Sequence, residues 1–258
     1  MEAIGVFDSG VGGLTVLKEL REILPHEHYI YFADTKNLPY GPKPNRQIQD
    51  LAQKAVDHFL NLGIKGLVIA CNTATGAALH LLEDQLNIPI IGVIEPGAKV
   101  AMSMSREKTF CLLATQATVK RGLYKRYLMD LDKDAKVLTQ ACPHLVTAVE
   151  DGFGDHYIGR TMAYEYLDQV EGDYDTLILG CTHFPLAMEG FKDYFRDKGR
   201  DVTIVDPAKA CALEAKAKIP GNASGPLKID YYCSGDRLRF KEVADKLLNE
   251  DIRVRPWK

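Results

Sequence analysis

Several features that define particular protein classes are missing from this 258-residue chain. No apolar run approaches the length of a membrane span, and no basic segment precedes the first strand as in a signal peptide, so we expect a cytoplasmic protein that does not contact a membrane. The six cysteines form no Cys-x-x-Cys pair and no metal-type Cys/His spacing, which favours reduced thiols over a disulfide or zinc framework. The formal net charge of −3 is too small to indicate nucleic acid as a partner.

The most informative feature of the sequence is a nine-residue pattern that occurs twice. Residues 66–74 are GLVIACNTA, and residues 176–184 are TLILGCTHF. Each begins as an apolar run typical of a buried parallel strand and then reaches a small residue, a cysteine and an Asn or Thr. Cys71 and Cys181 should therefore follow the carboxyl ends of two strands, where open α/β sheets bind ligands. The matched pair favours two thiols facing one cleft over two unrelated buried cysteines.

Short apolar runs alternate with helical patterns along the chain. This alternation predicts an α/β fold: two pseudo-symmetric three-layer α/β domains with mainly parallel sheets and an active-site cleft between them. Besides the two cysteine strands, strands are expected at 3–7, 28–33, 89–93, 109–114, 136–139, 202–205 and, as the last one, 228–233. Helices are expected at 14–24, 45–62, 77–82, 123–128, 157–167, 210–217 and 240–248.

Two domains follow from this order of elements. Residues 1–95 with 208–258 should form the first domain, which carries Cys71, and residues 96–207 the second, which carries Cys181. The chain is expected to cross between them at 95–97, where Glu-Pro-Gly interrupts the pattern. Asn45 is expected to cap the long helix that Gly63 ends.

The segment 8–13, Asp-Ser-Gly-Val-Gly-Gly, is a glycine-rich turn between a strand and a helix. Such a turn can bind an anion through its backbone N–H groups. Its glycines do not have the G-x-G-x-x-G spacing, and Asp8 at its start would repel a phosphate. Nucleotide binding is therefore not expected.

Two facing cysteines could form a disulfide, bind a metal, or act as an acid and a base on opposite faces of one carbon. The first two lack the required spacing or ligands, whereas the third leads to inversion at that carbon. Asp8, Glu150 and His183 could exchange protons with the thiols. The alternatives are that Asp8 caps the first helix, that His183 bonds to backbone at a helix start, and that Glu150 is a solvated charge. Asn72, Thr73 and Thr182 supply donors for a substrate carboxylate.

These residues lie in motifs through which the chain resembles the glutamate racemases of the cofactor-independent aspartate/glutamate racemase superfamily. The resemblance extends from residue 4 to about residue 245. The matching motifs are FDSGVGGLT (7–15), PYG (39–41), ACNTA (70–74), GVIEP (92–96) and LGCTHFPL (179–186). Phe184 stands where these proteins usually have Tyr, and the segment 143–152 around Glu150 matches more loosely.

The resemblance implies interconversion of L- and D-glutamate for peptidoglycan, with no metal or other cofactor, by a homodimer. It implies that Cys71 and Cys181 are the acid/base residues, that Asp8 assists Cys71, and that Glu150 and His183 assist Cys181. The substrate contacts that it implies are Asp8, Ser9, Tyr40, Gly41, Asn72, Thr73, Thr115, Thr118, Thr182 and His183.

Two other functions fit the same residues. A related enzyme could use the thiol pair on aspartate, a hydantoin or a maleate-type diacid, because the small polar residues around the cysteines do not define the length of the substrate. A two-domain protein could instead bind a small acid without catalysis, although such a protein needs no paired thiols.

Overall fold

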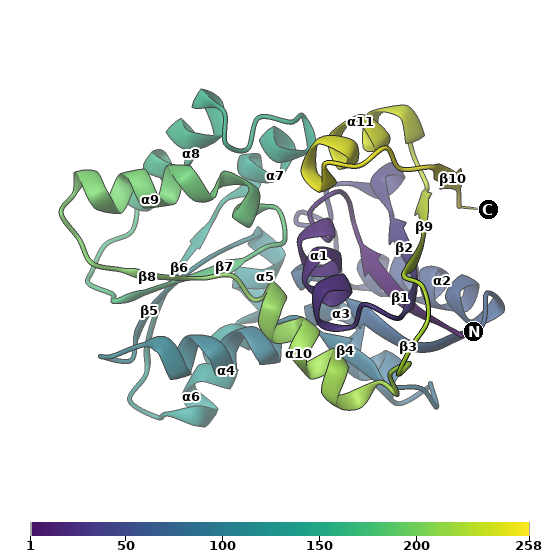
Figure 1. Ribbon diagram of the computed structural model, residues 1–258. Coiled ribbons are helices and arrows are strands. Elements are labelled where there is room, and N and C mark those ends of the chain that lie inside the picture. Colours follow the sequence, from purple (N-terminus) through teal and green to yellow (C-terminus); the bar gives the residue numbers. More distant parts are fainter. Residues whose placement is uncertain (1, 258) are drawn as a thin grey trace.

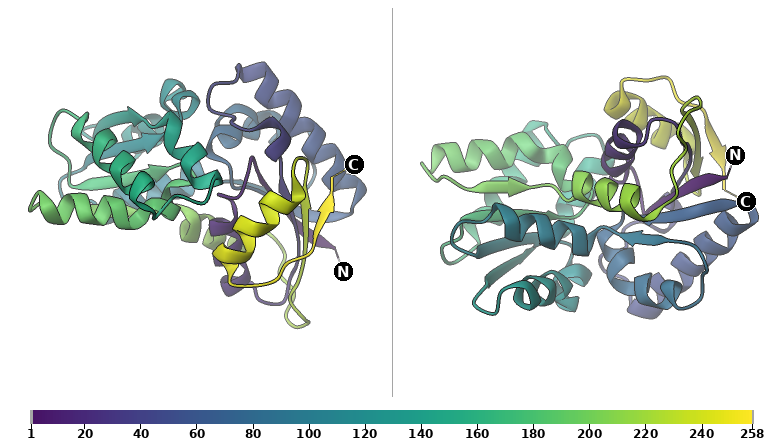
Figure 2. Two further views of the ribbon diagram at one scale, coloured as in Figure 1. Left: turned by 90° about the horizontal axis from the view of Figure 1, so that it is seen from above. Right: turned by 60° about the horizontal axis from the view of Figure 1, so that its bottom comes forward.

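The computed structural model describes residues 2–257, which form two parallel β-sheets with helices on both faces (Figure 1). The first sheet has six strands in the order β10-β9-β2-β1-β3-β4, and the second has four in the order β6-β5-β7-β8. The pairs in both sheets are parallel. Parallel neighbours need crossover connections, and helices provide them here. The α/β prediction is therefore confirmed, with the two sheets in separate halves of the molecule (Figure 2).

The strands agree with the predicted ones apart from a single addition. The first sheet contains β1 (Ala3–Asp8), β2 (His28–Ala33), β3 (Ile64–Ile69), β4 (Ile90–Gly92), β9 (Lys228–Cys233) and β10 (Val254–Pro256). The second contains β5 (Thr109–Ala114), β6 (Lys136–Ala141), β7 (Thr176–Gly180) and β8 (Thr203–Val205). The prediction that 228–233 is the last strand was wrong, because β10 follows it and pairs with it at the sheet edge.

The helices complete three layers in each half. They are α1 (Leu14–Ile23), α2 (Asn45–Asn61), α3 (Asn72–Glu83), α4 (Ile94–Met104), α5 (Gln116–Arg121), α6 (Leu123–Leu131), α7 (Pro143–Glu150), α8 (Tyr157–Asp168), α9 (Met188–Asp197), α10 (Ala208–Lys218) and α11 (Arg237–Leu248). Short 3₁₀ helices cover Thr35–Asn37 and Phe184–Ala187. Apolar side chains of α2 and α3 bury one face of the first sheet, and those of α8 and α9 bury one face of the second. A third cluster runs across both halves and includes residues of α1, α4 and α10.

The two sheets share a strand order, which puts Cys71 and Cys181 at equivalent positions. The order β2-β1-β3-β4 of the first sheet recurs as β6-β5-β7-β8 in the second. In each half the chain runs from the first strand to one side and then crosses to the other, which creates a switch point beside β1 and beside β5. Cys71 follows β3 and Cys181 follows β7, so the two thiols occupy equivalent positions.

Two local predictions were wrong. The segment 95–97 does not interrupt the pattern of strands and helices, because helix α4 runs through it. Pro96 lies in the first turn of α4, where a backbone N–H would have no partner within the helix. Asn45 does not cap α2; it is the first helical residue and Pro44 precedes it. The division of the chain into 1–95 with 208–258 and 96–207 stays a prediction.

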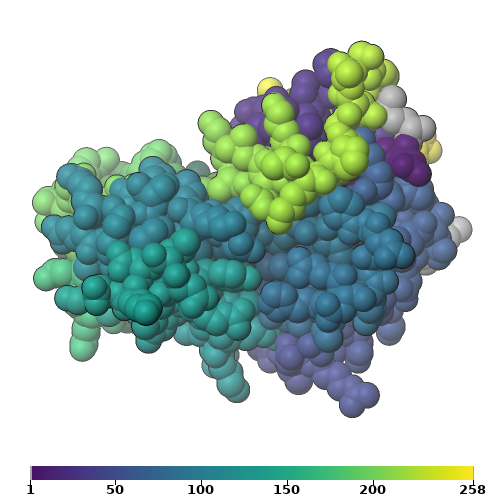
Figure 3. Space-filling view, turned by 90° about the horizontal axis from the view of Figure 1, so that it is seen from below, coloured from purple at the N-terminus to yellow at the C-terminus, as the bar shows by residue number. Residues whose placement is uncertain are grey.

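Helix α10 connects the two halves of the molecule. It packs against α1 of the first half and α4 of the second, and in the space-filling view from below it lies over their junction (Figure 3). Within residues 2–257 we find no helix with the length and apolar character that a membrane span requires.

Candidate active site

A cavity of about 220 Å³ lies between the two sheets and receives both cysteines. Its walls come from the loops that follow β1, β2, β3, β5, β6 and β7. The lining residues are Ser9, Pro39, Tyr40, Gly41, Pro42, Cys71, Asn72, Thr73, Thr115, Gln116, Pro143, His144, Val146, Thr147, Cys181, Thr182 and His183. The predicted convergence of the two thiols on one cleft is therefore found.

Cys71 sits between strand β3 and helix α3 and caps that helix. Its Sγ accepts a hydrogen bond from the backbone N–H of Ala74 at 3.4 Å and donates to Oγ of Ser9 at 3.7 Å. The side chain is 5% exposed, and burial raises the pKa of the thiol to about 12, with the nearby Asp8 carboxylate adding to the rise. Cys71 is therefore a protonated thiol at neutral pH.

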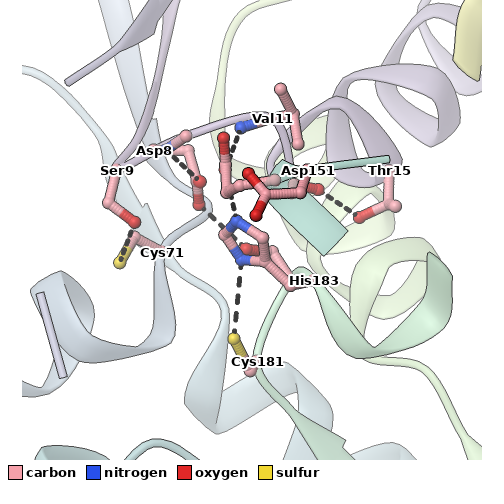
Figure 4. A network of polar contacts seen from close by, with 12 residues as sticks. Asp8, Ser9, Val11, Thr15, Cys71, Asp151, Cys181 and His183 are labelled. Atoms are coloured by element: carbon pink, nitrogen blue, oxygen red, sulfur yellow. Dashed lines mark hydrogen bonds and ion pairs between the residues drawn. The ribbon is translucent and has the colours of Figure 1, made fainter. Parts of the chain in front are cut away.

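Cys181 has a different environment because a histidine and a glutamate stand behind it. Nδ1 of His183 lies 3.6 Å from Sγ of Cys181, and Nε2 lies 2.6 Å from Oε1 of Glu150 (Figure 4). Burial lowers the pKa of His183, but its hydrogen bonds to Cys181 and Glu150 outweigh burial and hold the pKa well above its ordinary value. A protonated imidazole donates from both nitrogens, so it stabilises negative charge on the sulfur of Cys181.

Glu150 is not the solvated charge that its sequence neighbours suggested. It ends α7, its side chain is only 15% exposed, and Oε1 also accepts the backbone N–H of Val11 at 2.8 Å. The carboxylate thus joins His183 of the second half to the glycine-rich turn of the first half. This contact fixes the His183 ring against the turn and balances its charge.

Asp8 is fully buried at the end of β1 and does not cap α1, whose cap residue is Gly13. Its carboxylate accepts the N–H of Gly10 at 2.9 Å and the hydroxyl of Thr182 at 3.1 Å. Burial raises the pKa of Asp8 to about 6, although the His183 charge works in the opposite direction. In Figure 4 Asp8 lies between Ser9, which contacts Cys71, and His183, which contacts Cys181.

The glycines of the turn are required by close packing against these side chains. A Cβ on Gly10 would lie 1.9 Å from Oε1 of Glu150, and a Cβ on Gly12 would lie 2.6 Å from Nδ1 of His183. Any side chain there would displace the Glu150–His183 pair. The turn therefore acts as a wall behind the histidine rather than as a phosphate-binding loop.

Three threonines form a hydroxyl cluster across the opposite wall. Oγ1 of Thr73, from α3, lies 2.8 Å from that of Thr115 and 3.4 Å from that of Thr118. Thr115 caps α5 and accepts the N–H of Thr118 at 3.3 Å. We call Thr73, Thr115 and Thr118 the threonine cluster. It offers hydroxyl donors from both halves to an acceptor in the cavity.

Three further residues predicted to contact the substrate, Asn72, Tyr40 and Gly41, also line the cavity. Oδ1 of Asn72 accepts the hydroxyl of Tyr124 at 2.7 Å, which leaves the amide nitrogen to donate to a ligand. Tyr40 lines the cavity, and its hydroxyl donates to Asp34 at 2.6 Å. Gly41 faces Thr115, since a Cβ there would be 3.1 Å from that of Thr115.

All the predicted site residues lie at or directly behind this cavity, but several of its residues were missed. Thr147, Val146 and His144 come from α7, a helix that was not predicted. Pro143 at its start was the available signal, because proline is favoured in the first helical turn. Tyr124 was missed as a support for Asn72, although it lies four residues before Leu128 on the same buried stripe of α6.

Replacing Asp8 with asparagine should stabilise the fold at neutral pH. Because burial raises the pKa from 3.8 to about 6, the charged form is disfavoured in the folded state, and stability falls as pH rises through this window. At pH 7 the charge costs about 3 kcal/mol, which Asp8→Asn should largely recover. Urea unfolding at pH 7 measures the gain.

The gain should shrink as the pH falls from about 6 and should be absent below about pH 4, where Asp8 is neutral in both folded and unfolded chains. Asp57→Asn, on the exposed face of α2, should change the free energy of unfolding by less than about 0.5 kcal/mol. A destabilised Asp8→Asn protein at pH 7 would show that the carboxylate is held by its hydrogen bonds rather than penalised by burial.

The chemistry available here is proton transfer at a bound carbon. Two cysteine sulfurs share one cavity, one of them in contact with a histidine, and hydroxyl and amide donors surround them. Across the described part of the chain, no group of three or more His, Cys, Asp or Glu side chains could hold a metal ion.

Comparisons with known proteins show the family to which the chain is similar. A model of the Asp/Glu/hydantoin racemase family matches residues 4–215. The glutamate racemase of Streptococcus pneumoniae serotype 19F (strain G54) is 35% identical, over 97% of this chain and 96% of that protein. The crystal structure of glutamate racemase isoform RacE1 from Bacillus anthracis covers 100% of this chain and 97% of its own, with a TM-score of 0.93 and 35% identity. Glutamate racemase from Francisella tularensis, solved with D-glutamate, has a TM-score of 0.88 at 29% identity, covering 100% of this chain and 97% of its own.

Proposed function

The chain belongs to the Asp/Glu/hydantoin racemase family and is an isomerase; on that premise we propose that it interconverts L- and D-glutamate. The reaction is the removal of the Cα proton on one face and the return of a proton on the other, without a cofactor. The observation that carries the proposal is the shared cavity, which receives Cys71 and Cys181 from equivalent strand ends of the two halves.

The proton balance of the reaction uses the two sulfurs alternately. A thiolate takes the Cα proton, so that an S–H bond forms as the C–H bond breaks. The thiol on the opposite face then gives its proton to the carbanion and becomes the thiolate. Charge that moves onto the α-carboxylate in between is stabilised by the donors of Asn72, Thr73 and Thr182. Each turnover leaves the pair ready for the other enantiomer.

We infer that the sulfur of Cys181 acts as the base toward one enantiomer while the thiol of Cys71 acts as the acid. His183, kept protonated by Glu150, stabilises negative charge on Cys181, whereas burial and Asp8 keep Cys71 protonated. Asp8 has a pKa of about 6, and at neutral pH its carboxylate can take the proton of Cys71 when the reaction runs the other way.

Glutamate is proposed as the substrate because relatives that match nearly the full chain are glutamate racemases, one of them solved with D-glutamate. The resemblance also leads us to propose that the D-glutamate serves peptidoglycan synthesis and cell shape, that the enzyme is a homodimer, and that it works in the cytoplasm.

A substrate panel separates this proposal from the related activities. We expect kcat/KM for L-glutamate to exceed that for L-aspartate by roughly 100-fold, because one methylene in a fitted pocket discriminates by up to that order. Loss of optical rotation measures each rate. Faster inversion of aspartate, or of a hydantoin, would overturn the choice of substrate.

The same panel tests the non-catalytic alternative. If D-glutamate protects the two thiols from an alkylating reagent but no amino acid loses optical rotation, the chain is a binding protein and the proposed reaction is wrong.

A further inference from the structure

A half-buried arginine lies directly behind the threonine cluster and takes no part in the chemistry described above. Arg121 ends α5 in the second half of the molecule. Its Nη1 donates to the backbone oxygen of Thr73 at 3.1 Å, and Nη2 donates to Oδ1 of Asn45 at the start of α2. The guanidinium thus reaches across to two helices of the first half, one of which carries Cys71.

The charge of Arg121 is not balanced by a carboxylate. Among residues 2–257 no Asp or Glu oxygen lies within 4.0 Å of its guanidinium, whereas Arg21, Arg160 and Arg239 each form an ion pair. Both groups that accept its hydrogen bonds are neutral. A half-buried cation without an anionic neighbour exerts a field that water screens only in part.

The cavity itself holds no lysine or arginine among its lining residues. His183 lies there, but its charge is matched by Glu150, and the buried Asp8 adds a negative charge nearby. An amino acid with a second carboxylate would bring a net negative charge into this site. The hydroxyl of Thr115 can donate to that second carboxylate, yet it supplies no charge.

We propose that Arg121 determines the preference of the site for an acidic side chain, by placing an unpaired positive charge behind the threonine cluster. The occupied Nη1 and Nη2 groups mean that it acts through its field and through the position of Thr73, without direct contact. The hydrogen bond from Nη1 to the backbone oxygen of Thr73, two residues from Cys71, places the guanidinium directly behind the cavity wall. This inference rests on the proposed function for the identity of the acid.

Three variants separate charge from structure. Arg121→Gln removes the charge and keeps an amide donor. Arg121→Lys keeps the charge but loses the planar guanidinium group. Lys120→Gln removes a neighbouring exposed charge and serves as the control. For glutamate, Arg121→Gln should raise KM roughly 10-fold and change kcat by less than about 3-fold. Arg121→Lys should recover KM to within about 3-fold of the parent value, and Lys120→Gln should leave it unchanged.

Binding measured without turnover makes the test independent of catalysis. In the Cys71→Ser background, calorimetry should show that Arg121→Gln weakens D-glutamate roughly 10-fold and D-glutamine by less than about 2-fold. Equal weakening of both ligands, equal KM values in the parent and Arg121→Gln, or equal losses in Arg121→Gln and Arg121→Lys would overturn the inference. If D-glutamate binds with this preference but the parent enzyme does not invert it, the proposed function fails and the role of Arg121 stands.

Discussion

Replacing either Cys71 or Cys181 with serine is expected to lower the racemisation of glutamate by roughly 1000-fold. A hydroxyl is a much weaker acid than a thiol and a poor base at neutral pH, so the altered face can neither take nor return the Cα proton. Because inversion needs both faces, each single substitution should remove it in both directions. Loss of optical rotation from L-glutamate and from D-glutamate measures the effect.

Cys233→Ser is the matched control for this change. Cys233 is as buried as the two cavity thiols, but its Sγ contacts Oγ1 of Thr35 at 2.9 Å and lines no part of the cavity. A hydroxyl can keep that hydrogen bond, so the variant should retain activity within about 2-fold. Full activity in Cys71→Ser or in Cys181→Ser would remove the two-thiol mechanism.

Glu150→Gln is expected to lower kcat roughly 100-fold. An amide can still bond to His183, but it no longer provides the negative charge that keeps the imidazole protonated. The pKa of His183 should fall, and the negative charge on Cys181 would lose its counter-charge. Steady-state kinetics should show the loss in kcat with little change in KM, because Glu150 is not among the cavity-lining residues.

The pH profile separates this electrostatic role from simple misfolding. In Glu150→Gln, NMR of the His183 ring should show deprotonation at a lower pH than in the parent protein. Glu189→Gln, which alters an exposed carboxylate paired with Lys192, should leave both the profile and kcat unchanged. An unaltered kcat in Glu150→Gln would show that His183 does not depend on this carboxylate.

The strands and the positions of the two thiols could be predicted because they depend on local sequence. Continuous apolar runs such as 66–70 and 177–180 are typical of a parallel sheet covered on both faces, and the strands that contain them, β3 and β7, are buried almost throughout. A small residue and a cysteine at the end of each run then place the sulfur at the sheet edge. Equivalent positions in the two halves followed from the repeat.

The surroundings of Glu150 could not be predicted from local sequence. Its partners are His183, 33 residues away, and the N–H of Val11, 139 residues away, and only the folded chain brings them together. Helices α5 and α7 have six and eight residues, too few to show a clear helical period of apolar residues. β10 has three residues at a sheet edge, too few for a recognisable pattern. Arg121 gave no sequence signal because its function depends on the absence of a nearby carboxylate.

The central claim is that two sulfurs address one carbon from opposite faces, and solvent deuterium tests it directly. L-Glutamate is incubated with the enzyme in D₂O, and at low conversion each enantiomer is separated and analysed for deuterium at Cα. The two-thiol account predicts deuterium in nearly all of the D-glutamate formed and protium in the remaining L-glutamate, because the proton that leaves one face is not the proton that arrives at the other. Substrate-derived protium at Cα of the product would show that a single base carries the proton across, and it would contradict the account.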